Sequence, residues 1–433
     1  MSRSFEKALN PKAWWIVALA LGVLFRLLWV WDMEYKYDEN WMFERAIKVG
    51  QEGWQWLGMV SGQGGVKNPG LSVWIFIVLS KLFFVETPPE LCRAVIILNC
   101  TALIGLAVFA YRVVTRSERE TWIWASALVA LNPFAVLYER KIWAQSVMPL
   151  FCLLFVIGWW RRDRRWGAFL WGLVGACLGQ IHMPGFFYAA AFVAWVLIWK
   201  RENVEWKAWF AGSVLGALPL IPWVLYLFQN GGGEVYRVLS TKFYSFWITD
   251  TWGFGLGYSL GLSKGQGHFE QLKEFFAYPY IAGSATYLVG VVHAVMVLAG
   301  VSIIGRAALF LIHELRTRQR NWKQVLSGRD EPTAFAQQSA LIGYGAAISA
   351  ARFPMQRHYL LITYPLEFVW LARQALRPGL KVGRILLVTI LVCHAFITAS
   401  FLGFIHVNGG AMKGDYGKSY RAYFGSNPQS IFE

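Results

Sequence analysis

Two adjacent carboxylates, Asp38 and Glu39, follow the first long apolar segment of the chain, residues 13–31. Carboxyl groups beside a lipid boundary are costly unless they are paired or take part in chemistry. They could be solvated loop acids or first-turn charges of a helix. Carboxylates can also act as general bases, and we interpret the polar stretch 32–70 as the catalytic loop of a membrane enzyme.

A further set of polar side chains shares one expected depth, at the outer face of a membrane, although its members lie far apart in the sequence. A cavity lined by carboxylates and several basic side chains suits an anionic, phosphate-bearing ligand and an acid–base reaction. The set comprises Lys67, Arg93, Glu139, Arg140, Lys141, Gln145, His182, Arg352, Arg357 and His358, with Tyr359 next to it.

Each of these side chains also has a purely structural interpretation. Arg140 and Lys141 could extend from an interfacial helix end to reach water. His182 precedes a Met-Pro pair in a turn and could be a packing histidine. Arg93 suits a lipid headgroup anchor at a helix start, and for Arg357 the structural and functional interpretations are equally balanced.

The elements that must position these residues are membrane helices. Of 433 residues, 56% are hydrophobic and only 15% are charged, against about 25% charged in soluble domains. Apolar runs of bilayer length recur along the chain, and aromatic residues, 17% of the total, suit the membrane interfaces. The net charge of +16 is carried by short loops between these runs, which indicates a positive-inside topology and not a nucleic-acid partner. The five cysteines form no CxxC pair.

We therefore predict an all-α polytopic membrane protein of about eleven spans, forming one integral domain over residues 1–433. Its first helix is too long for a signal peptide and should remain as an anchor. The N-terminus is expected in the cytoplasm and the C-terminus outside a bacterial inner or plasma membrane. The apolar stretch 71–85 is short for a span, so we expect it to be interfacial or re-entrant. The other outer segments are the loop 229–280 and the tail 406–433.

Four segments, in their order along the chain, resemble the GT-C membrane glycosyltransferases, in particular the protein O-mannosyltransferase and lipid A aminoarabinose transferase group. The segment "YDE" at 37–39 follows the first helix, as an acidic pair does in that family. The segment "KNPG" at 67–70 precedes an apolar run. The segments "LNPFAVLYERKIWAQS" at 131–146 and "RFPMQRHYLLITYPLEFVWLA" at 352–372 are similar to later family segments.

The resemblance implies a GT-C bundle with interfacial helices in the first outer loop and a sugar donor linked to polyprenyl phosphate. The acceptor would be a glycolipid, a polysaccharide or a protein. Asp38 would be the general base or a carboxylate that positions the acceptor, with Glu39 as its acidic neighbour. The candidates for holding the donor phosphate are Lys67, Arg140, Lys141 and Arg357. His182, Gln145, His358 and Tyr359 are further cavity candidates.

The expected reaction is a single displacement that inverts the anomeric centre, without a covalent intermediate. We favour metal independence, although Asp38 and Glu39 are hard oxygen ligands that Asp32 or Glu34 could complete. The main alternative is a transporter or flippase of an anionic substrate. Transporters tend to show repeated halves, and no internal repeat is visible here. A structural partner in an envelope-polymer assembly is a third possibility.

Overall fold

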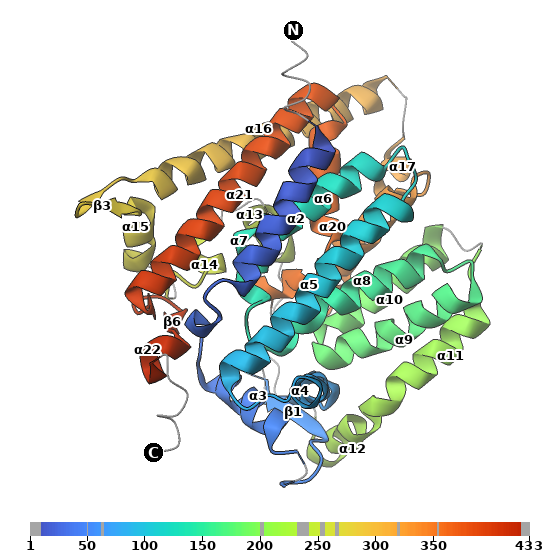
Figure 1. The fold of residues 1–433 in the computed structure, drawn as a ribbon. Helices are drawn as coiled ribbons and strands as arrows, with labels where there is room; N and C mark the ends of the chain where they lie inside the picture. The colour runs from blue at the N-terminus through green and yellow to red at the C-terminus, as the bar shows by residue number, and fades with distance from the viewer. Residues whose placement is uncertain are drawn as a thin grey trace.

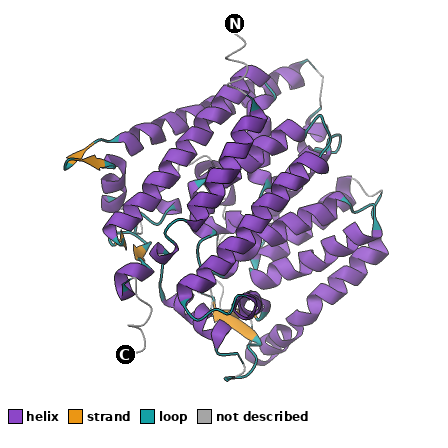
Figure 2. Ribbon diagram, viewed as in Figure 1, coloured by secondary structure: helices purple, strands orange, loops and turns teal. Residues whose placement is uncertain are grey.

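The computed structural model describes residues 10–49, 51–61, 65–199, 203–231, 242–251, 256–264, 268–317, 321–352 and 355–425. These segments are mostly helical, with three two-stranded hairpins (Figure 2). Parts of the first outer loop, of the loop 229–280 and of the tail 406–433 lie outside the described residues.

The first half of the chain forms helices α2 to α12 and one hairpin. The elements are α2 (Pro11–Leu27), η1 (Val30–Asp32), α3 (Tyr37–Ile47), β1 (Leu57–Val60), β2 (Lys67–Pro69), α4 (Leu71–Leu82), α5 (Pro88–Arg112), α6 (Arg119–Leu131), α7 (Pro133–Tyr138), η2 (Ala144–Val147), α8 (Met148–Trp160), α9 (Arg165–Ile181), α10 (Pro184–Trp199), α11 (Trp206–Ala217), η3 (Leu218–Leu220) and α12 (Ile221–Asn230).

The second half contains two long helices among shorter elements. These are α13 (Lys242–Thr251), α14 (Leu256–Ser259), α15 (Glu270–Ala277), β3 (Tyr280–Ile281), β4 (Ser284–Ala285), α16 (Leu288–Arg316), α17 (Trp322–Ser327), α18 (Pro332–Gln338), η4 (Ser339–Gly343), α19 (Tyr344–Ala350), η5 (Arg357–Thr363), α20 (Leu366–Leu376), α21 (Leu380–Asn408), β5 (Gly410–Ala411), β6 (Gly417–Lys418) and α22 (Tyr420–Phe424).

Four helices in the described part of the chain are long and apolar enough to cross a bilayer: 88–112, 206–230, 288–316 and 380–408. Three shorter apolar helices accompany them, at 71–82, 144–160 and 184–199. These long apolar helices mark the chain as an integral membrane protein. The expected number of about eleven spans is not confirmed.

Two helix boundaries differ from the sequence-based expectation for clear chemical reasons. The expected helix 121–138 is divided into α6 and α7, because Pro133 cannot continue α6 and the Asn132 side chain accepts the N–H of Ala135 to begin α7. The helix expected to end near residue 304 continues as α16 to Arg316. The basic segment predicted for 306–330 therefore begins inside a helix.

The elements of the first outer loop gather at one end of the bundle. Helix α4 is seen end-on in Figure 1, whereas α2, α5 and α21 are seen lengthwise across the picture. Helices α3 and α12, hairpin β1–β2 and helix α22 lie at the same end as α4, and the N-terminal end of α2 lies at the other (Figure 1). The first outer loop and the C-terminal tail therefore share one face.

Candidate functional site

Asp38 and Glu39 lie in the first turn of α3, but their surroundings differ. Asp38 is half-buried and lines two cavities. Glu39 is fully buried, and its Oε2 accepts the backbone N–H of Lys36 at 3.0 Å, which caps the helix. The structure thus places only one carboxylate of the predicted pair against open space.

The inner cavity has a volume of about 290 Å³ and brings together side chains from five separate regions of the chain. Of the predicted site residues, Asp38, Gln145, His182, His358 and Tyr359 line it. Gln145 Nε2 lies 3.5 Å from His182 Nδ1, and the His182 ring centroid lies 4.7 Å from that of Tyr359. The other lining residues are Met42, Met59, Val60, Ser61, Asn68, Ser72, Ile142, Trp143, Ala144, Ile181, Met183, Pro184 and Gln356.

The outer cavity, of about 470 Å³, adjoins hairpin β1–β2 and shares Asp38, Met59 and Val60 with the inner one. Lys67 and Arg45 are its basic lining residues. Its further lining residues are Tyr37, Trp41, Gln55 and Gly58.

Lys67 differs from the other predicted phosphate ligands in its partners. Its Nζ lies 5.9 Å from the ring centroid of Tyr226, and the Trp223 indole N–H donates to its carbonyl at 2.7 Å. No carboxylate lies within ion-pair distance of it among the residues that the structure describes. Helix α12 is thereby fixed against the outer cavity, while the Lys67 ammonium stays available to an anion.

Arg140 and Lys141 are buried and engaged elsewhere. The Arg140 guanidinium donates to the carbonyls of Phe25 at 2.8 Å and Trp29 at 2.9 Å, which ties it to the end of α2. The Lys141 ammonium forms an ion pair with Glu34 and lies 4.6 Å from the ring centroid of Trp143. Neither side chain lines the two cavities that contain Asp38.

Arg357 is also held by a carboxylate that the sequence analysis did not single out. Its guanidinium forms an ion pair with the buried Asp250 of α13, and the ring centroids of Phe246 and Tyr258 lie 4.7 and 4.9 Å away. The next residue, His358, lines the inner cavity. Asp250 and Arg357 therefore fix the segment that supplies His358.

The predicted outer-face residue Glu139 belongs to the interior. Its Oε2 accepts from Arg26 Nε at 2.6 Å, and both side chains are buried. Arg26 also donates to the carbonyls of Gly22 and Ala130. This pair joins α2 to α6 and α7 and supports the segment that carries Arg140.

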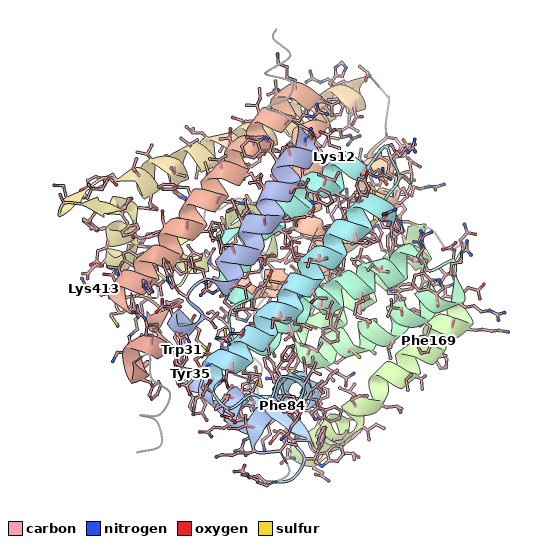
Figure 3. The ribbon with its side chains drawn as sticks, in the orientation of Figure 1. Lys12, Trp31, Tyr35, Phe84, Phe169 and Lys413 are labelled. Carbon is pink, nitrogen blue, oxygen red and sulfur yellow. The ribbon has the colours of Figure 1, made fainter. Side chains whose placement is uncertain are left out.

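The C-terminal tail closes one side of the first outer loop. The Asp32 carboxylate contacts His406 Nδ1 and Arg421 Nε, each at 2.6 Å. The Tyr420 N–H donates to the Met33 carbonyl at 2.9 Å, and the labelled Trp31 lies at this end (Figure 3). The first loop and the tail thus form one unit.

Burial changes the acidity of the carboxyl groups in this loop. Desolvation raises the pKa of Asp38 above its ordinary value of 3.8, and Lys36 and Lys141 partly oppose the shift. Desolvation, followed by the charge of Glu34, raises the pKa of Glu39 to about 8. A half-buried carboxylate with a raised pKa is better able to accept a proton.

The described residues contain no group of three His, Cys, Asp or Glu side chains that could hold a metal ion. Asp32 and Glu34, the suggested additional ligands, are instead engaged with basic side chains. Metal independence stays a prediction, which activity measurements with and without a chelator would test.

The sequence analysis missed several lining residues, whose only signal in the sequence is that they lie close to a predicted site residue. Asn68 follows Lys67 in "KNPG", and Gln356 precedes Arg357. Arg45 lies two turns beyond Asp38 on the same helix, a spacing that places both on one face. Asp250 gave no local signal, because it lies within the predicted loop 229–280, far from Arg357 in the sequence.

No protein-family model matches the sequence, and no curated protein matches it. Its structure is similar to that of an Archaeoglobus fulgidus oligosaccharyltransferase in the apo form, at a TM-score of 0.47 and 13% identity over 92% of this chain. The same archaeal enzyme in complex with an inhibitory peptide and a dolichol-phosphate gives a TM-score of 0.46 and 12% identity over 97% of this chain. The chain spans 57–58% of the length of these structures. A likeness this distant does not transfer an activity.

Proposed function

We propose that the protein is a glycosyltransferase that moves a sugar from a polyprenyl-phosphate donor to an acceptor at the outer membrane face. The observation that carries this proposal is the position of Asp38 at the junction of two cavities. A displacement at a sugar carbon needs the nucleophile and the leaving group on opposite sides of that carbon. A base that lines both a donor cavity and an acceptor cavity suits such a reaction.

The outer cavity is suited to the donor phosphate. Lys67 and Arg45 line it, and Lys67 is next to Trp223 and Tyr226 of α12. The apolar helix 206–230 is only 11% buried, so a prenyl chain could lie along it in the bilayer. Arg45 also pairs with the exposed Glu52. Arg140, Lys141 and Arg357 do not line this cavity, so they support the site and do not bind the phosphate directly.

In the proposed reaction, Asp38 accepts the proton of the acceptor nucleophile as that nucleophile attacks the anomeric carbon. The bond from this carbon to the phosphate oxygen breaks, and the electron pair leaves with the phosphate. Lys67 stabilises the negative charge that develops there. The anomeric configuration inverts in this single step.

A donor-consumption assay tests the proposal. Purified protein in lipid nanodiscs is given radiolabelled polyprenyl-phosphate sugars one at a time, together with a membrane extract as acceptor source. We expect one donor to be consumed, and Lys67→Ala to raise its KM at least tenfold, whereas Lys81→Ala, outside both cavities, leaves it unchanged. Consumption of no donor, combined with movement of one across the bilayer, would instead favour a flippase.

A further inference from the structure

The inner cavity lacks the basic side chains that mark the outer one. Among the described residues that line it, Asp38 is the only Asp, Glu, Lys or Arg. The other polar groups are neutral amides, hydroxyls and imidazoles, such as those of Gln145, Asn68 and Ser72. A cavity of this composition offers hydrogen bonds without a counter-charge for an anion.

The two histidines of the cavity are held in an uncharged form. Burial, followed by the charge of Lys141, lowers the pKa of His358 to about 3. Burial also lowers the pKa of His182, with His358 as a further cause. A neutral imidazole has one nitrogen that donates and one that accepts, which matches a ligand hydroxyl.

His182 has hydrogen-bonding capacity that the protein does not use. It is 9% exposed, and its Nε2 has no partner among the described residues, while its Nδ1 lies 3.5 Å from Gln145 Nε2. A buried polar atom without a partner is costly and needs an explanation. Because His182 also lines the inner cavity, its imidazole is a candidate to bind a hydroxyl there.

Size and aromatic surface narrow the ligand further. The cavity volume of about 290 Å³ lies at the lower end of the range for ligand sites, about 300–1,000 Å³. It suits one sugar ring. Trp143 and Tyr359 add aromatic groups to the lining, which can cover the apolar face of a sugar ring.

We propose that the inner cavity is the acceptor subsite and that it binds a polyhydroxylated group, a single sugar residue without phosphate or carboxylate. Gln145 and His182 bind its hydroxyls, and the attacking hydroxyl lies at Asp38. This inference rests on the proposed transferase function, because only a transferase would use the bound sugar as an acceptor. The binding of a neutral sugar in this cavity does not depend on transfer.

Saturation-transfer difference NMR on the full chain in nanodiscs tests this without any donor. The probes are methyl glucoside and methyl glucuronide, which are neutral and anionic. We expect the neutral glycoside to give at least five times the signal of the glucuronide. The signal should fall at least fivefold in Gln145→Ala and in His182→Ala, and partly recover in His182→Gln.

Two controls separate binding from folding. Gln338→Ala removes a glutamine that donates to Val325, far from the cavity in α18, and should leave the signal unchanged. Thermal unfolding of every variant identifies those that fail to fold. A stronger signal from the glucuronide than from the neutral glycoside, or a neutral signal that survives in folded Gln145→Ala and His182→Ala, would overturn the proposal. If the neutral glycoside binds as expected but the protein consumes no donor, the proposed transferase function is contradicted and the sugar site still stands.

Discussion

At the scale of single residues, the two adjacent carboxylates have different tasks. Asp38 faces two cavities, whereas Glu39 caps the helix that presents it. The sequence pattern pointed to both residues because adjacency and polarity do not reveal which way a side chain faces. The same holds for the predicted phosphate ligands. Lys67 lines the outer cavity, whereas Arg140 and Lys141 are buried, and the sequence pattern did not distinguish them.

The raised pKa of Asp38 predicts the acid limb of the pH profile. A base must be unprotonated, so kcat/KM should fall as the pH drops through a midpoint above the ordinary value of 3.8. Lys36 lowers the pKa of Asp38, so Lys36→Ala should move the midpoint to higher pH. Steady-state rates between pH 4 and 8 measure both midpoints. An activity that stays flat over this range in both proteins would contradict the role of Asp38 as a base.

At the scale of elements, a buried ion pair holds the helices that support the site. Arg26 of α2 binds Glu139, after α7, and the carbonyl of Ala130 in α6. The helices approach closely there, since a Cβ on Gly22 would lie 2.6 Å from the Ala130 oxygen. The sequence alone does not predict this contact, because pairing between Arg26 and Glu139, over more than a hundred residues, depends on the tertiary fold.

Breaking this pair should be costly. Glu139→Ala leaves the Arg26 charge buried and unpaired, and should lower the free energy of unfolding by about 3–5 kcal/mol. The double variant Arg26→Met, Glu139→Leu should lose less than the sum of the two single losses. Unfolding in mixed micelles with increasing SDS measures each variant. For comparison, Glu52→Ala in the exposed Arg45–Glu52 pair should cost less than about 1 kcal/mol. If Glu139→Ala also lowered the free energy of unfolding by less than about 1 kcal/mol, the buried pair would have no supporting role.

The helix boundaries followed from local chemistry where capping residues and prolines were present. The division at Asn132 and Pro133 uses signals visible in the sequence. The extension of α16 to Arg316 does not, because basic residues are compatible both with a loop and with a helix that leaves the membrane. Hydropathy alone therefore predicts the order of the long helices better than the residues at which they begin and end.

At the scale of the whole molecule, distant segments meet at one end of the bundle. The first outer loop, the turn between α9 and α10, and η5 all line the inner cavity, and the tail holds the first loop through Asp32. The sequence predicted this convergence from membrane topology, since loops on one side of a bilayer share a face. It could not predict the two cavities, because both are lined by residues of hairpin β1–β2 together with residues from distant segments.

The most direct test of the central claim, that Asp38 is the base between two substrates, compares Asp38→Asn with wild type in nanodiscs. Donor binding and donor turnover are measured on the same samples, with Asp163→Asn, in the basic turn between α8 and α9, as the matched control. We predict a loss of turnover of at least about 100-fold in Asp38→Asn, with donor affinity within threefold of wild type and an unaltered control. Turnover at the wild-type rate in Asp38→Asn would contradict the assignment.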